Sequence, residues 1–138
     1  MTFNVHVFSG IFESRGEALL YSEGQWEPEP SIDASELEFD TWEARNPMWQ
    51  LKRELDVYLN ADFVGTIHGV HLFSYLAELL VDATEVDAIR TSAALEANTM
   101  ILIFDQALRG FRVRLSSTSR LDYLGEYRCR PLRGVSTS

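Results

Sequence analysis

TMILIF, residues 99–104, is a short and almost continuously apolar run. A run of this length is typical of a strand that is buried on both faces of a sheet. We therefore predict that Thr99–Phe104 is the central strand of the fold.

Three further segments have the alternation of apolar and polar residues that strands show. GFRVRL, residues 110–115, predicts a strand with one wet face that pairs with 99–104 through a turn near 108–110. FNVHVF, residues 3–8, predicts a first strand, and residues 124–129 could add another.

Helical spacing and capping residues predict helices between these strands. Ser14 and Glu17 have capping-box spacing, which predicts a helix from there to about Ser22. Asn46-Pro47 predicts a helix start, because Asn can cap and Pro is favoured at the first helical position; apolar residues at helical spacing then continue to Leu59. Residues 60–69 predict a turn and a possible short strand. Two helices are expected after it, at 72–81 and at 86–95. The first of these has a stripe of apolar residues that we expect to be buried: Leu72, Tyr75, Leu76, Leu79 and Leu80. These elements predict an α+β fold: residues 1–138 as a single domain, with helices packed on a small, mostly antiparallel sheet.

Length and composition suit a folded domain without covalent cross-links. The chain has 138 residues, of which 46% are hydrophobic, enough to bury a core. Cys129 is the only cysteine, which excludes an internal disulfide and suits a reducing compartment. Its neighbours Arg128 and Arg130 would lower the thiol pKa, whereas a half-buried strand position would leave it inert. With no secretory signal and no apolar run of about 20 residues, we expect a cytoplasmic protein without a membrane partner.

The formal net charge of −9 is unevenly distributed. Residues 1–104 carry 18 acids and five bases (−13), and residues 105–138 carry three acids and seven arginines (+4). Nucleic acid is a poor partner for the acidic part, because its phosphates would be repelled. A basic protein is a better candidate.

EGQWEPEPSIDASELEFDTWE, residues 23–43, concentrates this charge: it holds eight acids and no Lys or Arg. Pro28 and Pro30 argue against regular structure at its start. The run is either a solvated surface or a face that binds a cationic partner, with tryptophans as anchors. On the second interpretation the partner-binding residues are Trp26, Glu27, Glu29, Asp33, Glu36, Glu38, Asp40, Trp42 and Glu43.

No set of catalytic residues emerges from the sequence, and we predict no cofactor and no metal site. His68 and His71 in HGVH could bind a metal with Asp62 or His6, but they lack the HExxH pattern and equally fit a turn. Asp105, after the predicted central strand, could be a functional carboxylate or an ordinary turn residue.

The order of several motifs resembles the immunity protein 22 family of bacterial polymorphic toxin systems. The matching motifs are VHVFSGIFESRGEALLYSE with the turn Gly10-Ile11-Phe12 and with Tyr21, then Asp62-Phe63, Ser74-Tyr75, MILIFD and LDYLGEYRC. The resemblance implies an α+β fold and a non-enzymatic role, the binding and neutralisation of a partner toxin. It assigns no binding residues.

Together these observations predict an immunity protein that neutralises a cognate basic toxin, such as a nuclease, through an acidic face. A nuclease attracts phosphates with Lys and Arg, and an acidic inhibitor can occupy that surface. Two alternatives are a small metal-dependent hydrolase using His68, His71 and Asp62, and a generic acidic interaction module.

Overall fold

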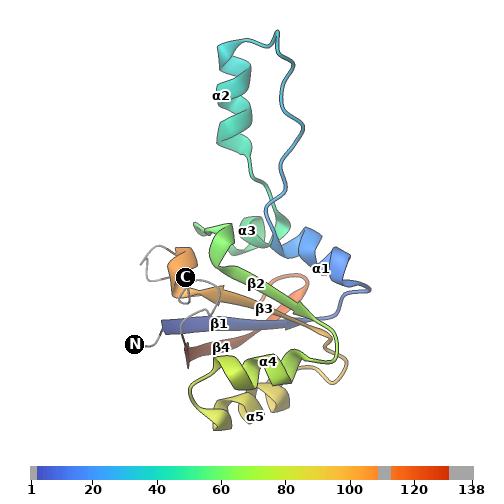
Figure 1. The fold of residues 1–138 in the computed structure, drawn as a ribbon, viewed down its shortest axis with the longest axis vertical. Coiled ribbons are helices and arrows are strands. Elements are labelled where there is room, and N and C mark those ends of the chain that lie inside the picture. The colour runs from blue at the N-terminus through green and yellow to red at the C-terminus, as the bar shows by residue number, and fades with distance from the viewer. Residues whose placement is uncertain (1–2, 109–112, 131–138) are drawn as a thin grey trace.

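A computed structural model describes residues 3–108 and 113–130. They form a four-stranded antiparallel sheet with the order β2-β3-β1-β4, covered on both faces by helices (Figure 1). The strands are β1 (Phe3–Gly10), β2 (Val64–His68), β3 (Thr99–Phe104) and β4 (Leu121–Cys129). The helices are α1 (Arg15–Ser22), α2 (Glu36–Arg45), α3 (Gln50–Leu55), α4 (Leu72–Leu79) and α5 (Ala83–Ser92), with short 3₁₀ helices η1 (Ala61–Phe63) and η2 (Asp105–Leu108). The predicted α+β class with a small antiparallel sheet is confirmed.

β3 is a central strand, as its apolar sequence predicted. All six of its residues are buried. Its two hydrogen-bonding edges are occupied by β1 and β2, so the predicted pairing of residues 110–115 with it is wrong. Residues 109–112 lie outside the described residues, and residues 113–115 belong to no strand. The second neighbour of β1 is β4, which includes the predicted segment 124–129.

The sheet separates two hydrophobic cores. On one face, Phe8, Ile101 and Ile103 pack with side chains from α1 and α3. On the other, Val7 and Leu102 pack with the leucines of α4 and with α5, as the layers in Figure 1 show. Each large apolar side chain that leaves water contributes about 1.5–3 kcal/mol, so the two cores supply most of the driving force for folding.

Most predicted helices are present, with two corrections. Ser14 caps α1 as expected, since its Oγ accepts a hydrogen bond from the Glu17 N–H (3.1 Å). Tyr75, expected in the buried stripe of α4, is instead 42% exposed. The predicted helix start at Asn46-Pro47 is wrong: Asn46 follows the end of α2, and α3 begins only at Gln50.

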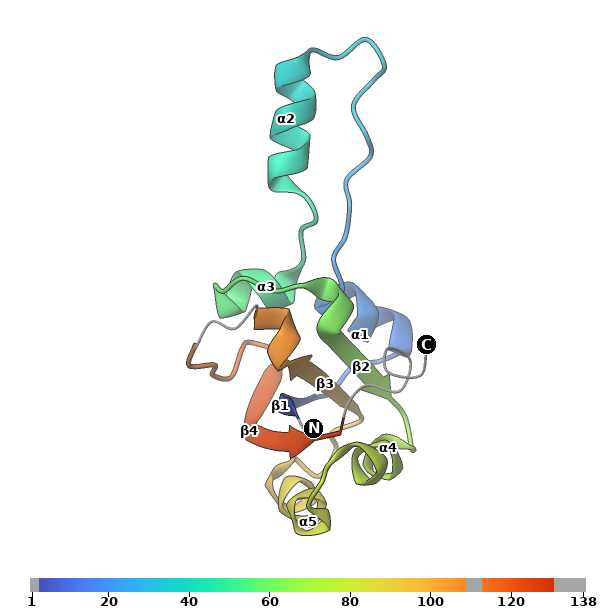
Figure 2. The same cartoon turned by 60° about the vertical axis from the view of Figure 1, so that its left-hand side comes forward.

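Residues 26–47, here called the arm, project away from the α1/α3 layer (Figures 1 and 2). At its base Gln25 and Met48 are paired in antiparallel fashion, each N–H donating to the other's carbonyl at 2.8 Å. No residue of the arm belongs to either hydrophobic core. Within residues 3–108 and 113–130, none of the helices has the length and apolarity to span a bilayer.

Candidate functional site

The lower part of the arm is held together by contacts between its two chain segments, residues 26–27 and residues 42–46. The Trp42 indole N–H donates to the Glu27 carbonyl (3.1 Å), and the Glu27 N–H donates to Asn46 Oδ1 (2.9 Å). The Arg45 guanidinium lies 2.8 Å from the Glu27 carboxylate, and the rings of Trp26 and Trp42 are in tilted contact with centroids 5.3 Å apart. The arm is therefore held together by its own contacts. None of its residues belongs to the hydrophobic cores of the body, as we call the described residues outside 26–47.

The upper part of the arm is α2, a helix that the sequence analysis did not predict. Its N-cap is Ser35, whose Oγ accepts a hydrogen bond from the Glu38 N–H (3.1 Å). The Ser35-to-Glu38 spacing is the same capping-box signal that located α1, so the helix could have been found from the sequence. Glu36 and Glu38 lie in the first turn and Arg45 in the last, where each charge is favourable to the helix dipole.

The arm presents acidic groups to solvent. α2 has no buried residue. Of the predicted partner-binding acids, Glu27 is half-buried at the base, and the others are exposed: Glu29, Asp33, Glu36, Glu38, Asp40 and Glu43. The structure thus places these acids together on one projecting element.

Apolar side chains are exposed between the acids. Trp26 is 57% exposed, while Trp42 is half-buried and contacts Trp26 and Glu27. Sequence analysis missed Ile32 and Leu37, which are 94% and 73% exposed. Leu37, Trp42, Pro28 and Pro30 help to line an open groove of about 410 Å³. Exposed apolar groups rimmed by polar residues are typical of protein-binding surfaces.

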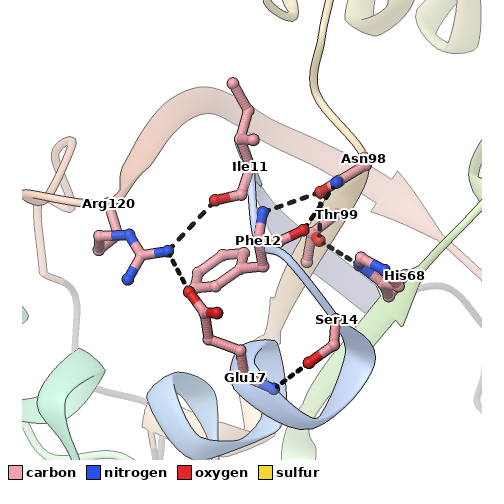
Figure 3. A network of polar contacts seen from close by, with 8 residues as sticks. All are labelled: Ile11, Phe12, Ser14, Glu17, His68, Asn98, Thr99 and Arg120. Atoms are coloured by element: carbon pink, nitrogen blue, oxygen red, sulfur yellow. Dashed lines mark hydrogen bonds and ion pairs between the residues drawn. The ribbon is translucent and has the colours of Figure 1, made fainter.

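His68 belongs to a network of hydrogen bonds between the end of β2 and the start of β3 (Figure 3). Its Nδ1 lies 2.8 Å from Thr99 Oγ1, and the Thr99 hydroxyl donates to Asn98 Oδ1 (2.9 Å). Since that hydroxyl has only one hydrogen, we infer that His68 Nδ1 carries a proton and donates it to Thr99. The ring thereby joins the end of β2 to the start of β3.

The same network holds the turn between β1 and α1. The Asn98 side chain accepts from the Phe12 N–H (3.0 Å) and donates to the Phe12 carbonyl (2.8 Å). Arg120 donates to the Ile11 carbonyl (3.2 Å) and to Glu17 (2.9 Å), as Figure 3 shows. The turn Gly10-Ile11-Phe12 is thus fixed to Asn98 and Arg120, which directly precede β3 and β4.

The other residues of the hydrolase hypothesis are not brought together. Asp62 lies in η1 before β2, while His68 ends β2, and a strand of five residues spans about 17 Å. His71 is exposed at the N-terminus of α4. In the described part of the chain, no potential metal-binding group of three ligands contains Asp62, His68 or His71.

Cys129 and Trp49 are buried residues of the body. The Cys129 side chain has no exposed surface, and burial, assisted by the charge of Asp105, raises its thiol pKa to about 11. Of the two interpretations of this cysteine, the structure supports the inert buried thiol, because desolvation outweighs any lowering of the pKa by Arg128 and Arg130. Trp49 is a core residue at 3% exposure.

Comparisons of the chain with family models, with curated proteins and with solved structures gave no match.

Proposed function

We propose that this protein is a cytoplasmic, non-enzymatic inhibitor of the immunity type, which binds and neutralises a cognate basic toxin protein through its arm. The observation that carries the proposal is the arm itself. It is a braced projection that exposes acids and apolar side chains, yet it contributes to neither hydrophobic core. A partner protein that binds this surface would account for an element that takes no part in core packing.

The charges and the apolar groups would act at different stages of binding. Exposed carboxylates on a projecting helix create a negative potential that attracts a basic surface and increases the association rate. Trp26, Ile32 and Leu37 are then available as anchors that leave water on contact. A nuclease fits this surface because its substrate-binding face must be basic, and covering that face would block catalysis.

The test starts with capture of a partner from the source cell's lysate at low and high salt, followed by kinetics with the purified partner. The arm variant Asp33→Lys/Asp40→Lys/Glu43→Lys spares the acidic first turn of α2. It is compared with Glu78→Lys/Asp87→Lys/Glu96→Lys, which reverses three exposed acids outside the arm. The two variants carry the same net charge, so only the position of the charge differs.

We expect the arm variant to lower the association rate at low salt by about tenfold or more, and the body variant to change it much less. The captured protein should be basic and toxic, and its activity should stop on binding. Equal effects of the two variants would exclude the arm as the binding surface. A captured partner without toxic activity would favour the generic interaction module instead.

A further inference from the structure

Three side chains with metal-binding groups lie together where β1 runs between β4 and the end of β3. One ring nitrogen of His6 and one carboxylate oxygen each of Asp105 and Glu126 lie within 4.8 Å of one another. His6 in β1 is directly opposite Glu126 in β4, and Asp105 follows the last residue of β3. The Asn4 N–H donates to Asp105 Oδ2 (2.9 Å), which holds that carboxylate beside β1. Two adjacent strands, β1 and β4, and the residue that follows β3 therefore place the three groups together.

A β-bulge in β4 completes this arrangement. The register of β1 and β4 shifts between Val7, which is opposite Gly125, and Phe8, which is opposite Tyr123. Gly125 has φ +121°, a conformation that favours glycine. The extra residue puts Tyr123 on the same face as Glu126, since in a regular strand residues three apart point to opposite faces.

Tyr123 orients the histidine. Its hydroxyl lies 2.8 Å from His6 Nδ1, and the His6 side chain is only 5% exposed. Nε2 has no hydrogen bond to the described residues, and it offers its lone pair to a ligand in the tautomer in which Nδ1 carries the proton and donates it to the Tyr123 hydroxyl oxygen. A hydrogen bond to the second ring nitrogen is the usual way in which proteins fix a metal-binding histidine.

The two carboxylates are not neutralised by a base in the described part of the chain. The ion pairs found there are Arg45–Glu27 and Arg120–Glu17. Two negative charges beside a buried imidazole therefore attract a cation. Ligand atoms around a bound Zn²⁺ are about 3.3 Å apart, so no pair of the three groups needs to approach by more than about 1.5 Å. Side-chain rotations can make a movement of this size, and the Glu126 side chain is exposed and free to move.

We propose that His6, Asp105 and Glu126 bind a divalent transition-metal ion. One imidazole and two carboxylates suit Zn²⁺ or Mn²⁺ better than Ca²⁺ or Mg²⁺, which prefer oxygen ligands alone. Three protein ligands leave at least one coordination position open to water or to an atom of a bound molecule. The site lies on the body and does not depend on the arm or on the proposed partner.

The experiment titrates Zn²⁺ into the untagged full chain, freed of metal by chelator, with calorimetry as the readout. Glu126→Gln and Asp105→Asn remove one charge each while keeping the side-chain shape, and the Asn oxygen can still accept from Asn4. Asp122→Asn removes an exposed acid from the same strand and is the matched control. We expect one Zn²⁺ per chain, with binding weakened at least about tenfold in the two site variants and unchanged in the control.

A second readout identifies the histidine. The chain has three histidines, and the ring-nitrogen resonances of His6 should move on Zn²⁺ addition while those of His68 and His71 stay in place. The proposal is overturned if Zn²⁺ does not bind stoichiometrically, if Asp122→Asn weakens binding as much as Glu126→Gln, or if the resonances of His68 or His71 move instead. Should Asp105→Asn fail to fold, the exposed position of Glu126 lets its variant decide alone.

Discussion

At the scale of single residues, burial determines the chemistry of Cys129 more strongly than the charges beside it in sequence. Raising its pKa from 9.0 to about 11 lowers the thiolate fraction at pH 8 roughly 100-fold. We predict that a thiol reagent modifies the native protein at pH 8 at least that much more slowly than the urea-unfolded chain. Because Cys129 is the only cysteine, the reagent's absorbance reports this residue alone. Equal rates in the two states would show that the thiol is accessible and ionised.

Asn98 is the residue on which the β1–α1 turn depends. Its side chain makes two hydrogen bonds to the backbone of Phe12 and accepts a third from Thr99. Asn98→Ala leaves these groups without their partner, and we predict a loss of about 1–3 kcal/mol in the free energy of unfolding. Urea denaturation measures the loss, with Glu96→Ala, an exposed neighbour, as the control. A stability equal to that of the control would mean that water replaces the amide without penalty.

At the scale of elements, the spacing of capping residues is enough to locate a helix when it is considered in every segment of the chain. The capping-box spacing of Ser14 predicts α1, and the identical spacing at Ser35 indicates α2. α2 was not predicted, because residues 23–43 were interpreted by their charge, as a solvated surface or a binding face, and not by their capping residues. Asn46 illustrates an ambiguity that the sequence alone does not resolve. Asn can cap the start of a helix, but here its N–H and its side-chain amide both donate to the Trp42 carbonyl and close α2.

The stability of α2 should depend on Trp42. A helix of ten residues without a buried face is marginal by itself, and Trp42 provides both the ring contact with Trp26 and the hydrogen bond to Glu27. Trp42→Ala should therefore destabilise the arm locally by about 1–3 kcal/mol, the sum of an aromatic pair and a hydrogen bond. Hydrogen exchange of amides 36–45 should accelerate, while exchange in β1 and β3 stays unchanged.

Glu43→Ala is the control for that experiment, because Glu43 is exposed on the same helix. Unchanged exchange in α2 of the Trp42 variant would contradict the bracing role of the tryptophan. Acceleration throughout the sheet would instead show that the arm and the body unfold together.

At the scale of the whole molecule, the sequence predicts what depends on neighbours along the chain and misses what depends on topology. The apolar run of β3 was sufficient to identify the central strand. Its partners were not predictable, since pairing with β1 and β2 joins segments separated by long stretches of chain. The same applies to His6, Asp105 and Glu126: the sequence singled out His6 and Asp105 separately, and only the strand order brings them together with Glu126.

The body should fold without the arm. Neither core includes a residue of the arm, and Gln25 and Met48 at its base already form the doubly hydrogen-bonded pair that flanks a two-residue hairpin turn. Replacing residues 26–47 with Asn-Gly, the sequence favoured in such a turn, should therefore close the gap without strain. The shortened protein should unfold cooperatively, with a Tm within about 4 °C of the parent, a change that corresponds to about 1 kcal/mol.

Calorimetry measures this Tm, and titrations on the same shortened protein separate the two proposed sites. Partner binding should be lost, because the acids and the exposed apolar groups are removed, whereas Zn²⁺ binding at His6, Asp105 and Glu126 should persist, because all three belong to the body. A broad or absent unfolding transition would show that the body needs the arm to fold. A stable shortened protein that still neutralises the partner would move the binding surface to the body and leave the arm without the role proposed for it.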